Sequence, residues 1–181
     1  AQKEFTNYQG TGSSIMEMSH RGPEYTKVDA DATSSLKRIL GLGDDFEVVF
    51  LQGGASLQFL QVAMNFLGEG ETADYINTGA WSQKAIKEAK AFGTVNTAYS
   101  SEVSNFNRVP ASNELSLTEN ANYVHFTSNN TIFGTQFPTE PETNGVPLIC
   151  DASSDFLSRP IDIQKYGLIY AGAQKIWVLQ E

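Results

Sequence analysis

The predicted fold is decided by one segment, Asp74-Tyr75-Ile76-Asn77-Thr78-Gly79-Ala80-Trp81-Ser82, which has the pattern of a strand followed by a turn of small residues. Residues 81–91 then have the spacing of a helix, Gly93 ends it, and residues 95–99 have the pattern of a second strand. Strands that alternate with helices are typical of a parallel sheet with covered faces. The segment therefore predicts an α/β fold.

Upstream of this segment the alternation continues. The apolar residues of 23–40 fall on one face of a helix, with Pro23 suited to its first turn and Gly41 to its end. Residues 47–51 form a short, continuous apolar run, which is typical of a strand buried on both faces. Residues 57–66 follow a glycine-rich turn and predict another helix.

Downstream, a polar stretch over residues 100–122 predicts a long connection. Three further strands are predicted at residues 123–127, 147–151 and 168–170. We therefore expect a three-layer α/β/α arrangement around a mainly parallel sheet, in one domain over residues 1–181.

Composition excludes several classes of protein. The chain has 181 residues, of which 40% are hydrophobic, so it can build a core and is not intrinsically disordered. The net charge of −9 argues against a protein that binds the phosphate backbone of nucleic acid. No stretch approaches the roughly 20 apolar residues of a membrane helix. The single cysteine, Cys150, cannot form an internal disulfide, which favours a cytoplasmic location. No metal site is predicted.

The edge of the sheet where the strands end is the predicted binding site, because ligands of parallel sheets lie there. Five segments at this edge combine small residues with one polar, aromatic or charged group: residues 52–56, 78–81, 128–131, 151–154 and 171–175. Together they predict a cofactor site.

Within that edge, the turn over residues 53–56 could bind a phosphate at the start of a helix, although such a glycine pair is more often a tight turn. Asp151 and Lys175 fit pyridoxal phosphate chemistry, which needs a lysine for the Schiff base and a carboxylate for the ring nitrogen. A capping aspartate and a surface lysine fit the spacing equally well. Trp81 could stack on a cofactor ring or belong to the core. His125 lies inside a predicted strand, which favours a core histidine with satisfied hydrogen bonds over a catalytic base.

Four stretches carry a resemblance to a known family, and the match runs from Phe5 to Lys175. The stretches are Ser14-Ile15-Met16-Glu17-Met18-Ser19-His20-Arg21-Gly22, Gly53-Gly54-Ala55-Ser56-Leu57-Gln58-Phe59, Thr78-Gly79-Ala80-Trp81-Ser82 and Tyr170-Ala171-Gly172-Ala173-Gln174-Lys175. They resemble the phosphoserine aminotransferases, which are fold-type I, class V pyridoxal phosphate enzymes. The resemblance implies that residues 1–181 are a partial large, cofactor-binding domain.

For the cofactor, the resemblance implies that Lys175 holds pyridoxal 5′-phosphate covalently and acts as the catalytic residue. Asp151 would pair with the ring nitrogen, and Trp81 would stack on the ring. Ala55 and Ser56 would donate to the phosphate, and the remaining implied cofactor-binding positions are Thr131 and Gln174.

For the substrate, the resemblance implies that His20 and Arg21 meet its acidic end, because a guanidinium binds a carboxylate or phosphate in two places. The implied reaction transfers an amino group from L-glutamate to 3-phosphohydroxypyruvate, giving O-phospho-L-serine, in serine biosynthesis. The resemblance also implies a cytoplasmic homodimer, and use of 4-phosphohydroxythreonine in pyridoxine biosynthesis is an open alternative.

The family pattern departs from this sequence in two places. Some members have an arginine where this chain has Ser56, and the family continues beyond Lys175 into a small domain that we expect to be missing here. The opening residues read like the end of a helix, so we also expect the natural chain to begin upstream.

Three alternatives remain open. One is a truncated large domain without catalysis. A second is another class V transaminase, such as an alanine–glyoxylate enzyme. A third is a cysteine desulfurase, against which the buried-strand position of Cys150 argues.

Overall fold

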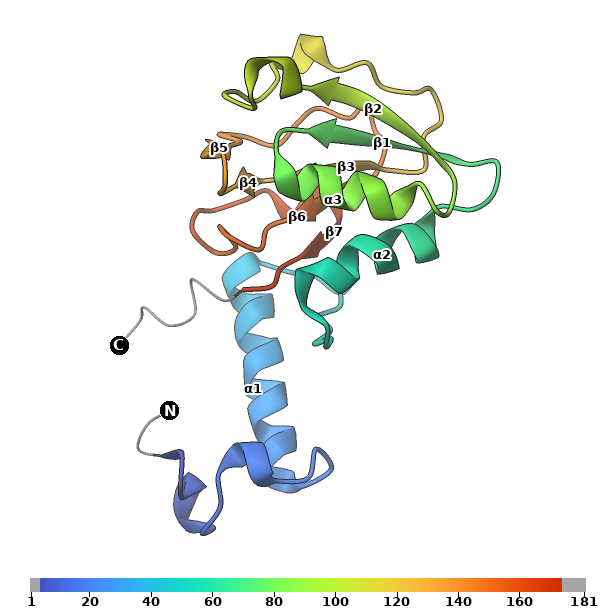
Figure 1. Ribbon diagram of the computed structural model, residues 1–181. Coiled ribbons are helices and arrows are strands. Elements are labelled where there is room, and N and C mark those ends of the chain that lie inside the picture. Colours follow the sequence, from blue (N-terminus) through green and yellow to red (C-terminus); the bar gives the residue numbers. More distant parts are fainter. Residues whose placement is uncertain (1–3, 174–181) are drawn as a thin grey trace. The chain divides into compact units, whose positions relative to one another are not determined.

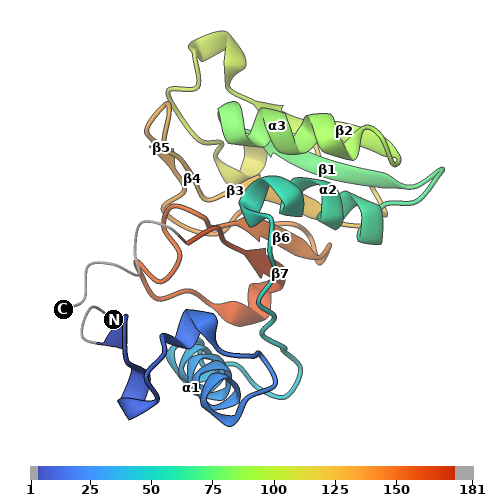
Figure 2. The same ribbon diagram turned by 60° about the horizontal axis from the view of Figure 1, so that its bottom comes forward.

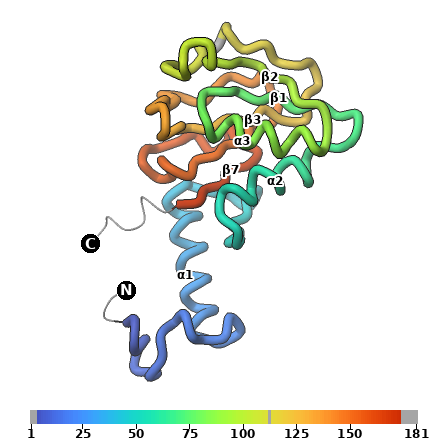
Figure 3. The backbone as a smooth tube through the Cα atoms, viewed as in Figure 1, coloured from blue at the N-terminus to red at the C-terminus, as the bar shows by residue number. Residues whose placement is uncertain are grey.

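The structure is a computed structural model that describes residues 4–173, with the exception of the Ser112 side chain. Figure 1 labels its helices and strands, and Figure 3 traces the backbone along the chain. The chain divides into two compact units, Ala1–Phe50 and Leu51–Glu181.

The first unit contains one long helix, α1 (Pro23–Leu40). Pro23 occupies its first turn, and Gly41 ends it in the left-handed conformation with its N–H bonded to the Lys37 carbonyl. The prediction of a helix over these residues is therefore confirmed at both ends. Two short 3₁₀ turns, Tyr8–Gly10 and Ile15–Glu17, precede it. None of the helices within residues 4–173 is both long and apolar enough to cross a membrane.

The second unit is built on a five-stranded sheet in the order β2-β1-β3-β6-β7, and all its neighbouring strands are parallel. The strands are β1 (Thr72–Asn77), β2 (Thr94–Ser100), β3 (Val124–Thr127), β6 (Leu148–Asp151) and β7 (Tyr166–Tyr170). Figure 2 shows them side by side. The predicted α/β class and the mainly parallel sheet are confirmed.

Two helices, α2 (Gly54–Phe66) and α3 (Ala80–Ala89), pack on one face of this sheet. Their buried side chains meet alternate residues of the strands, because successive strand side chains point to opposite faces. The shared core includes Phe59 and Val62 from α2, Ile86 from α3, Tyr75 from β1, and Tyr123, which directly precedes β3.

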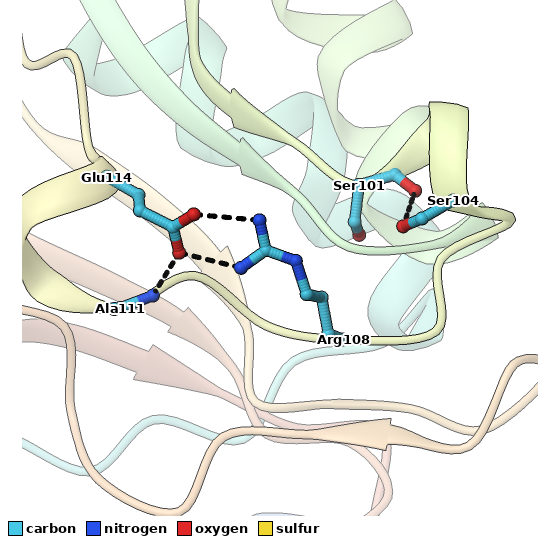
Figure 4. Close-up of polar contacts among 5 residues, drawn as sticks. All are labelled: Ser101, Ser104, Arg108, Ala111 and Glu114. Atoms are coloured by element: carbon cyan, nitrogen blue, oxygen red, sulfur yellow. Dashed lines mark hydrogen bonds and ion pairs between the residues drawn. The ribbon is translucent and has the colours of Figure 1, made fainter.

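The long polar connection after β2 is ordered by its own side chains (Figure 4). The Arg108 guanidinium donates to both carboxylate oxygens of Glu114 at 2.7 Å, and the Ala111 N–H donates to the same carboxylate at 2.8 Å. These donors hold the pKa of Glu114 at about 2. The Ser104 hydroxyl donates to the Ser101 carbonyl at 2.9 Å. The segment is a connection, as predicted, with local 3₁₀ turns at Glu102–Ser104 and Ser112–Glu114.

One predicted strand is wrong. Residues 47–51 form no strand, and Val49, Phe50 and Leu51 are 71%, 54% and 61% exposed. An apolar run becomes a strand only where a neighbouring strand pairs with it, and none does within the described sheet. The boundary between the two units falls at this run.

The sequence also failed to predict a short antiparallel hairpin, β4 (Asn129–Asn130) and β5 (Thr135–Gln136), which follows β3. Strands of two residues are too short to show an alternating pattern. The fold of the second unit thus places this hairpin, together with the starts of α2 and α3, at the edge where β3 and β6 end.

Candidate active site

A pocket of about 340 Å³ opens at this edge of the sheet. Its volume lies in the range of about 300–1,000 Å³ that is typical of small-molecule sites. The pocket is lined by Gly53, Gly54, Ala55, Ser56, Phe59, Trp81, Thr127, Asn129, Thr131, Asp151, Ser153, Ser154 and Gly172. All of these residues belong to the second unit.

One end of the pocket is the start of helix α2. Gly53 precedes the helix with a φ of 94°, and no side chain caps the first turn. The first N–H groups of a helix have no partner within it, so those of Ala55 and Ser56 are available to an anion. Gly172 comes very close here, since a Cβ on it would lie 3.2 Å from the Ala55 nitrogen. The missing side chain keeps this N–H accessible.

A carboxylate lies at the end of β6. Asp151 is only 3% exposed, and its Oδ1 accepts hydrogen bonds from the N–H and the hydroxyl of Ser153 at 3.0 and 2.6 Å. The Ser153 Oγ in turn accepts from the Gly172 N–H at 3.0 Å. Burial raises the pKa of Asp151, and the Ser153 hydrogen bonds partly oppose that rise. Within residues 4–173, no hydrogen bond uses Oδ2, so that oxygen remains for a ligand.

An aromatic side chain lies at the start of α3. The Trp81 N–H donates to Asn130 Oδ1 at 3.2 Å, and its indole Nε1–H donates to Thr131 Oγ1 at 3.3 Å. The Lys84 ammonium lies 4.2 Å from the centroid of the indole ring, in a cation–π contact. The half-buried ring is thus fixed in place while it lines the pocket.

The structure brings five of the predicted residues together on this pocket: Ala55, Ser56, Trp81, Thr131 and Asp151. Two others, Gln174 and Lys175, lie outside the described residues. His20 and Arg21 are exposed and belong to the first unit, so their part in the site stays a prediction.

Sequence reasoning missed two contributions to the pocket. The orienting role of Ser153 could have been found from its position two residues after Asp151, because aspartate side chains often bond the backbone two residues on. Phe59 gave no such signal, since an apolar residue on a helix reads as core. The prediction that His125 is a core histidine is confirmed, since it is 1% exposed and its Nε2 lies 2.8 Å from the Tyr170 hydroxyl. The prediction that its hydrogen bonds are satisfied is wrong for Nδ1, which has no partner within residues 4–173.

Comparison with known proteins decides the family. The model of the class-V aminotransferases matches residues 1–178. The chain belongs to the class-V aminotransferase family. The resemblance drawn from its motifs is thereby confirmed at this level.

Individual relatives are phosphoserine aminotransferases. The one from Desulfosudis oleivorans is 58% identical over 175 residues, covering 96% of this chain and 48% of that protein. A solved phosphoserine aminotransferase, described for radiation damage of its Schiff base, superposes with a TM-score of 0.93 at 48% identity, covering 97% of this chain and 49% of that one. The PLP-bound enzyme from Trichomonas vaginalis gives a TM-score of 0.86 at 40% identity, covering 94% and 48%. The chain spans about half the length of the relatives it matches.

Proposed function

We propose that the pocket binds pyridoxal 5′-phosphate. We also propose that the chain serves the transfer of an amino group from L-glutamate to 3-phosphohydroxypyruvate, giving O-phospho-L-serine and 2-oxoglutarate. The observation that carries the proposal is that one pocket joins a buried, oriented carboxylate, an uncapped helix start and a fixed indole ring. The high identity to phosphoserine aminotransferases supports the choice of substrates.

The phosphate end of the cofactor fits the start of α2. The N–H groups of Ala55 and Ser56 and the Ser56 hydroxyl are donors, and the helix dipole favours an anion there. A side chain at position 172 would fill the space next to the Ala55 nitrogen. The absence of that side chain supports a bound group at this point.

Asp151 and Trp81, which line the same pocket, would hold the ring of the cofactor. When bound, pyridoxal phosphate supplies an electron sink that stabilises negative charge at the substrate Cα. The Asp151 Oδ2 is the acceptor that would hold a proton on the ring nitrogen, and Ser153 keeps this carboxylate oriented. The Trp81 indole offers a flat face to the cofactor ring. The Thr131 hydroxyl fixes the edge of this indole by accepting a hydrogen bond from its Nε1–H.

The remaining roles rest on residues that the resemblance assigns. Lys175 would hold the cofactor, take the proton from the substrate Cα and deliver it to the cofactor carbon, and Gln174 would be a further cofactor-binding residue. His20 and Arg21 bind the second anionic group that both substrates carry. 4-Phosphohydroxythreonine as an alternative substrate would present a similar phosphate to the same residues.

The proposal extends to a homodimer in the cytoplasm. The family resemblance supports the dimer, and the single cysteine supports a reducing compartment.

The structure gives no support to a desulfurase. That chemistry needs a mobile, nucleophilic cysteine, whereas Cys150 is 2% exposed within β6. Burial also raises the pKa of its thiol well above the usual value, which disfavours the thiolate.

The proposed function is tested by adding pyridoxal phosphate to the purified chain and recording near-visible absorbance, then adding glutamate and measuring 2-oxoglutarate. Asp151→Asn should keep the absorbance but slow the reaction about ten- to a hundredfold, because a charge-assisted hydrogen bond of roughly 1.5–3 kcal/mol is lost. Asp45→Asn makes the same chemical change at an exposed position in the first unit and should leave the rate unchanged. A chain without cofactor-dependent absorbance, or an Asp151→Asn variant with the parental rate, contradicts the proposal.

A further inference from the structure

A fully buried amide lies beside the proposed cofactor site. Asn130, on strand β4, is 0% exposed, and its side chain makes three hydrogen bonds, all to the segment that begins α3. Its Oδ1 accepts from the Trp81 N–H at 3.2 Å. Its Nδ2 donates to the hydroxyls of Thr78 and Ser82 at 2.9 and 3.1 Å. Both hydrogens of the amide group and its oxygen are therefore used.

The bond to Trp81 supplies a cap that the helix otherwise lacks. Gly79 precedes α3 and has no side chain to accept a hydrogen bond. The N–H of Trp81 lies in the first turn, where no partner within the helix exists. Asn130 reaches it from another element and acts as the cap.

The close approach of the two elements depends on Gly79. A Cβ at this position would lie 2.7 Å from Cγ of Asn130. On the other strand of the hairpin, the Thr135 hydroxyl donates to the Thr78 carbonyl at 2.8 Å. Both strands thus form hydrogen bonds to the same turn, so the hairpin and the start of α3 are joined in one hydrogen-bond network.

The hairpin is also anchored through its turn. Phe133, in its turn, packs against Phe106 with ring centroids 4.8 Å apart. Phe106 is buried and has a φ of 55°, which is uncommon for a bulky residue and persists only where packing sustains it. The hairpin therefore has a fixed position from which to hold Trp81.

We infer that Asn130 is a positioning residue that sets the Trp81 indole against the cofactor ring. Residue 130 fixes the Trp81 backbone, and the next residue, Thr131, fixes the edge of its ring. This inference rests on the proposed function, because it assigns Asn130 an effect on the cofactor that acts through Trp81. A merely structural asparagine would instead affect stability alone.

The first test needs no cofactor. Hydrogen exchange of the Trp81 amide is measured by NMR in the parent chain and in Asn130→Ala. The exchange should become at least about tenfold faster in the variant, beyond any change in the β1 amides, because the only acceptor described for this N–H is removed. Ile132→Ala, on the same hairpin turn but 61% exposed, should exchange like the parent. A parental rate in Asn130→Ala overturns the inference.

The second test measures the affinity for 4′-deoxypyridoxine 5′-phosphate, which cannot bond covalently to a lysine. Trp81→Leu and Asn130→Ala should each weaken binding about two- to tenfold, the value of an aromatic contact. The double variant should bind no more weakly than Trp81→Leu alone, because Asn130 acts through Trp81. Additive losses, or a parental affinity in Asn130→Ala while Trp81→Leu loses affinity, overturn the inference.

Two further outcomes separate the inference from the proposed function. A parent chain that does not bind the analogue, or a Trp81→Leu variant with parental affinity, contradicts the proposed site, and the exchange test then decides whether Asn130 places Trp81. If Asn130→Ala does not fold, Asn130→Asp decides, because it keeps the acceptor and loses both donors. Slow Trp81 exchange in Asn130→Asp supports positioning, and fast exchange overturns it.

Discussion

Replacing His125 with glutamine should flatten the dependence of stability on pH below about pH 6.5. The His125 ring is buried against Tyr75, with ring centroids 4.8 Å apart, and its Nε2 lies 2.8 Å from the Tyr170 hydroxyl. Its Nδ1 is buried and has no hydrogen-bond partner within residues 4–173. Burial lowers the pKa of His125 from 6.5 to about 3, so the folded chain keeps this ring neutral in mild acid.

The sign and size of the effect follow from proton binding. Between pH 6.5 and pH 3 the unfolded chain binds a proton at this histidine and the folded chain does not, so stability falls as the pH falls through this window. At pH 4 the unfolded-state pKa lies 2.5 units above the pH, and each unit corresponds to about 1.4 kcal/mol, which gives a loss of roughly 3 kcal/mol.

Urea unfolding at pH 7 and pH 4 measures this loss. The free energy of unfolding of the parent should fall by about 3 kcal/mol more than that of His125→Gln, because the carboxylates contribute alike to both chains. Glutamine keeps a polar partner for the Tyr170 hydroxyl. His20→Gln makes the same change at an exposed position and should follow the parent. Equal losses in the parent and in His125→Gln would refute a neutral, buried imidazole.

Three other changes test the site and its support. Because burial raises the pKa of Asp151, ionisation of this carboxyl lowers the stability of the folded chain as the pH rises above 3.8. Asp151→Asn should therefore raise the melting temperature of the cofactor-free chain at pH 7, and the gain in melting temperature should shrink toward pH 4. Gly172→Ala should weaken pyridoxal phosphate binding about ten- to a hundredfold in an absorbance titration, because the new Cβ crowds the Ala55 N–H and removes its hydrogen bond to the phosphate, worth roughly 1.5–3 kcal/mol. Gly167→Ala is the control: its Cβ would also meet its nearest neighbour at 3.2 Å, and it should leave cofactor binding unchanged. Gly79→Ala should lower the free energy of unfolding by about 1–3 kcal/mol in urea, through overlap with Asn130, and unchanged stability would contradict that contact.

The elements that were predicted from sequence have local signals of their own. Helix α1 has proline at its start and glycine at its end. Strands β6 and β7 are short, largely apolar segments, Leu148–Asp151 and Tyr166–Tyr170. Residues 47–51 carry the same apolar signal without a strand beside them, and a sequence pattern does not reveal the partner. The β4–β5 hairpin has no periodic signal at all, because its strands have two residues each.

The part of the site that lies at strand ends could be predicted from the sequence. The rule that ligands lie beyond the ends of parallel strands located Asp151 and the turn that carries Trp81. Asn130 bonds to a turn that lies 49 residues earlier in the chain, and this contact depends on how the hairpin packs. The spacing of residues in the sequence does not predict it. Residue types therefore predicted the kind of ligand that the pocket could bind, whereas the contacts that position its side chains depend on tertiary packing.

Borohydride reduction of the chain with pyridoxal phosphate, followed by peptide mapping, identifies the lysine that holds the cofactor. We expect one stable adduct, on Lys175, and its loss in Lys175→Ala. An adduct on Lys84, Lys87 or Lys90 instead, or no adduct under conditions in which the chain is folded, would contradict the assignment of this pocket to pyridoxal phosphate.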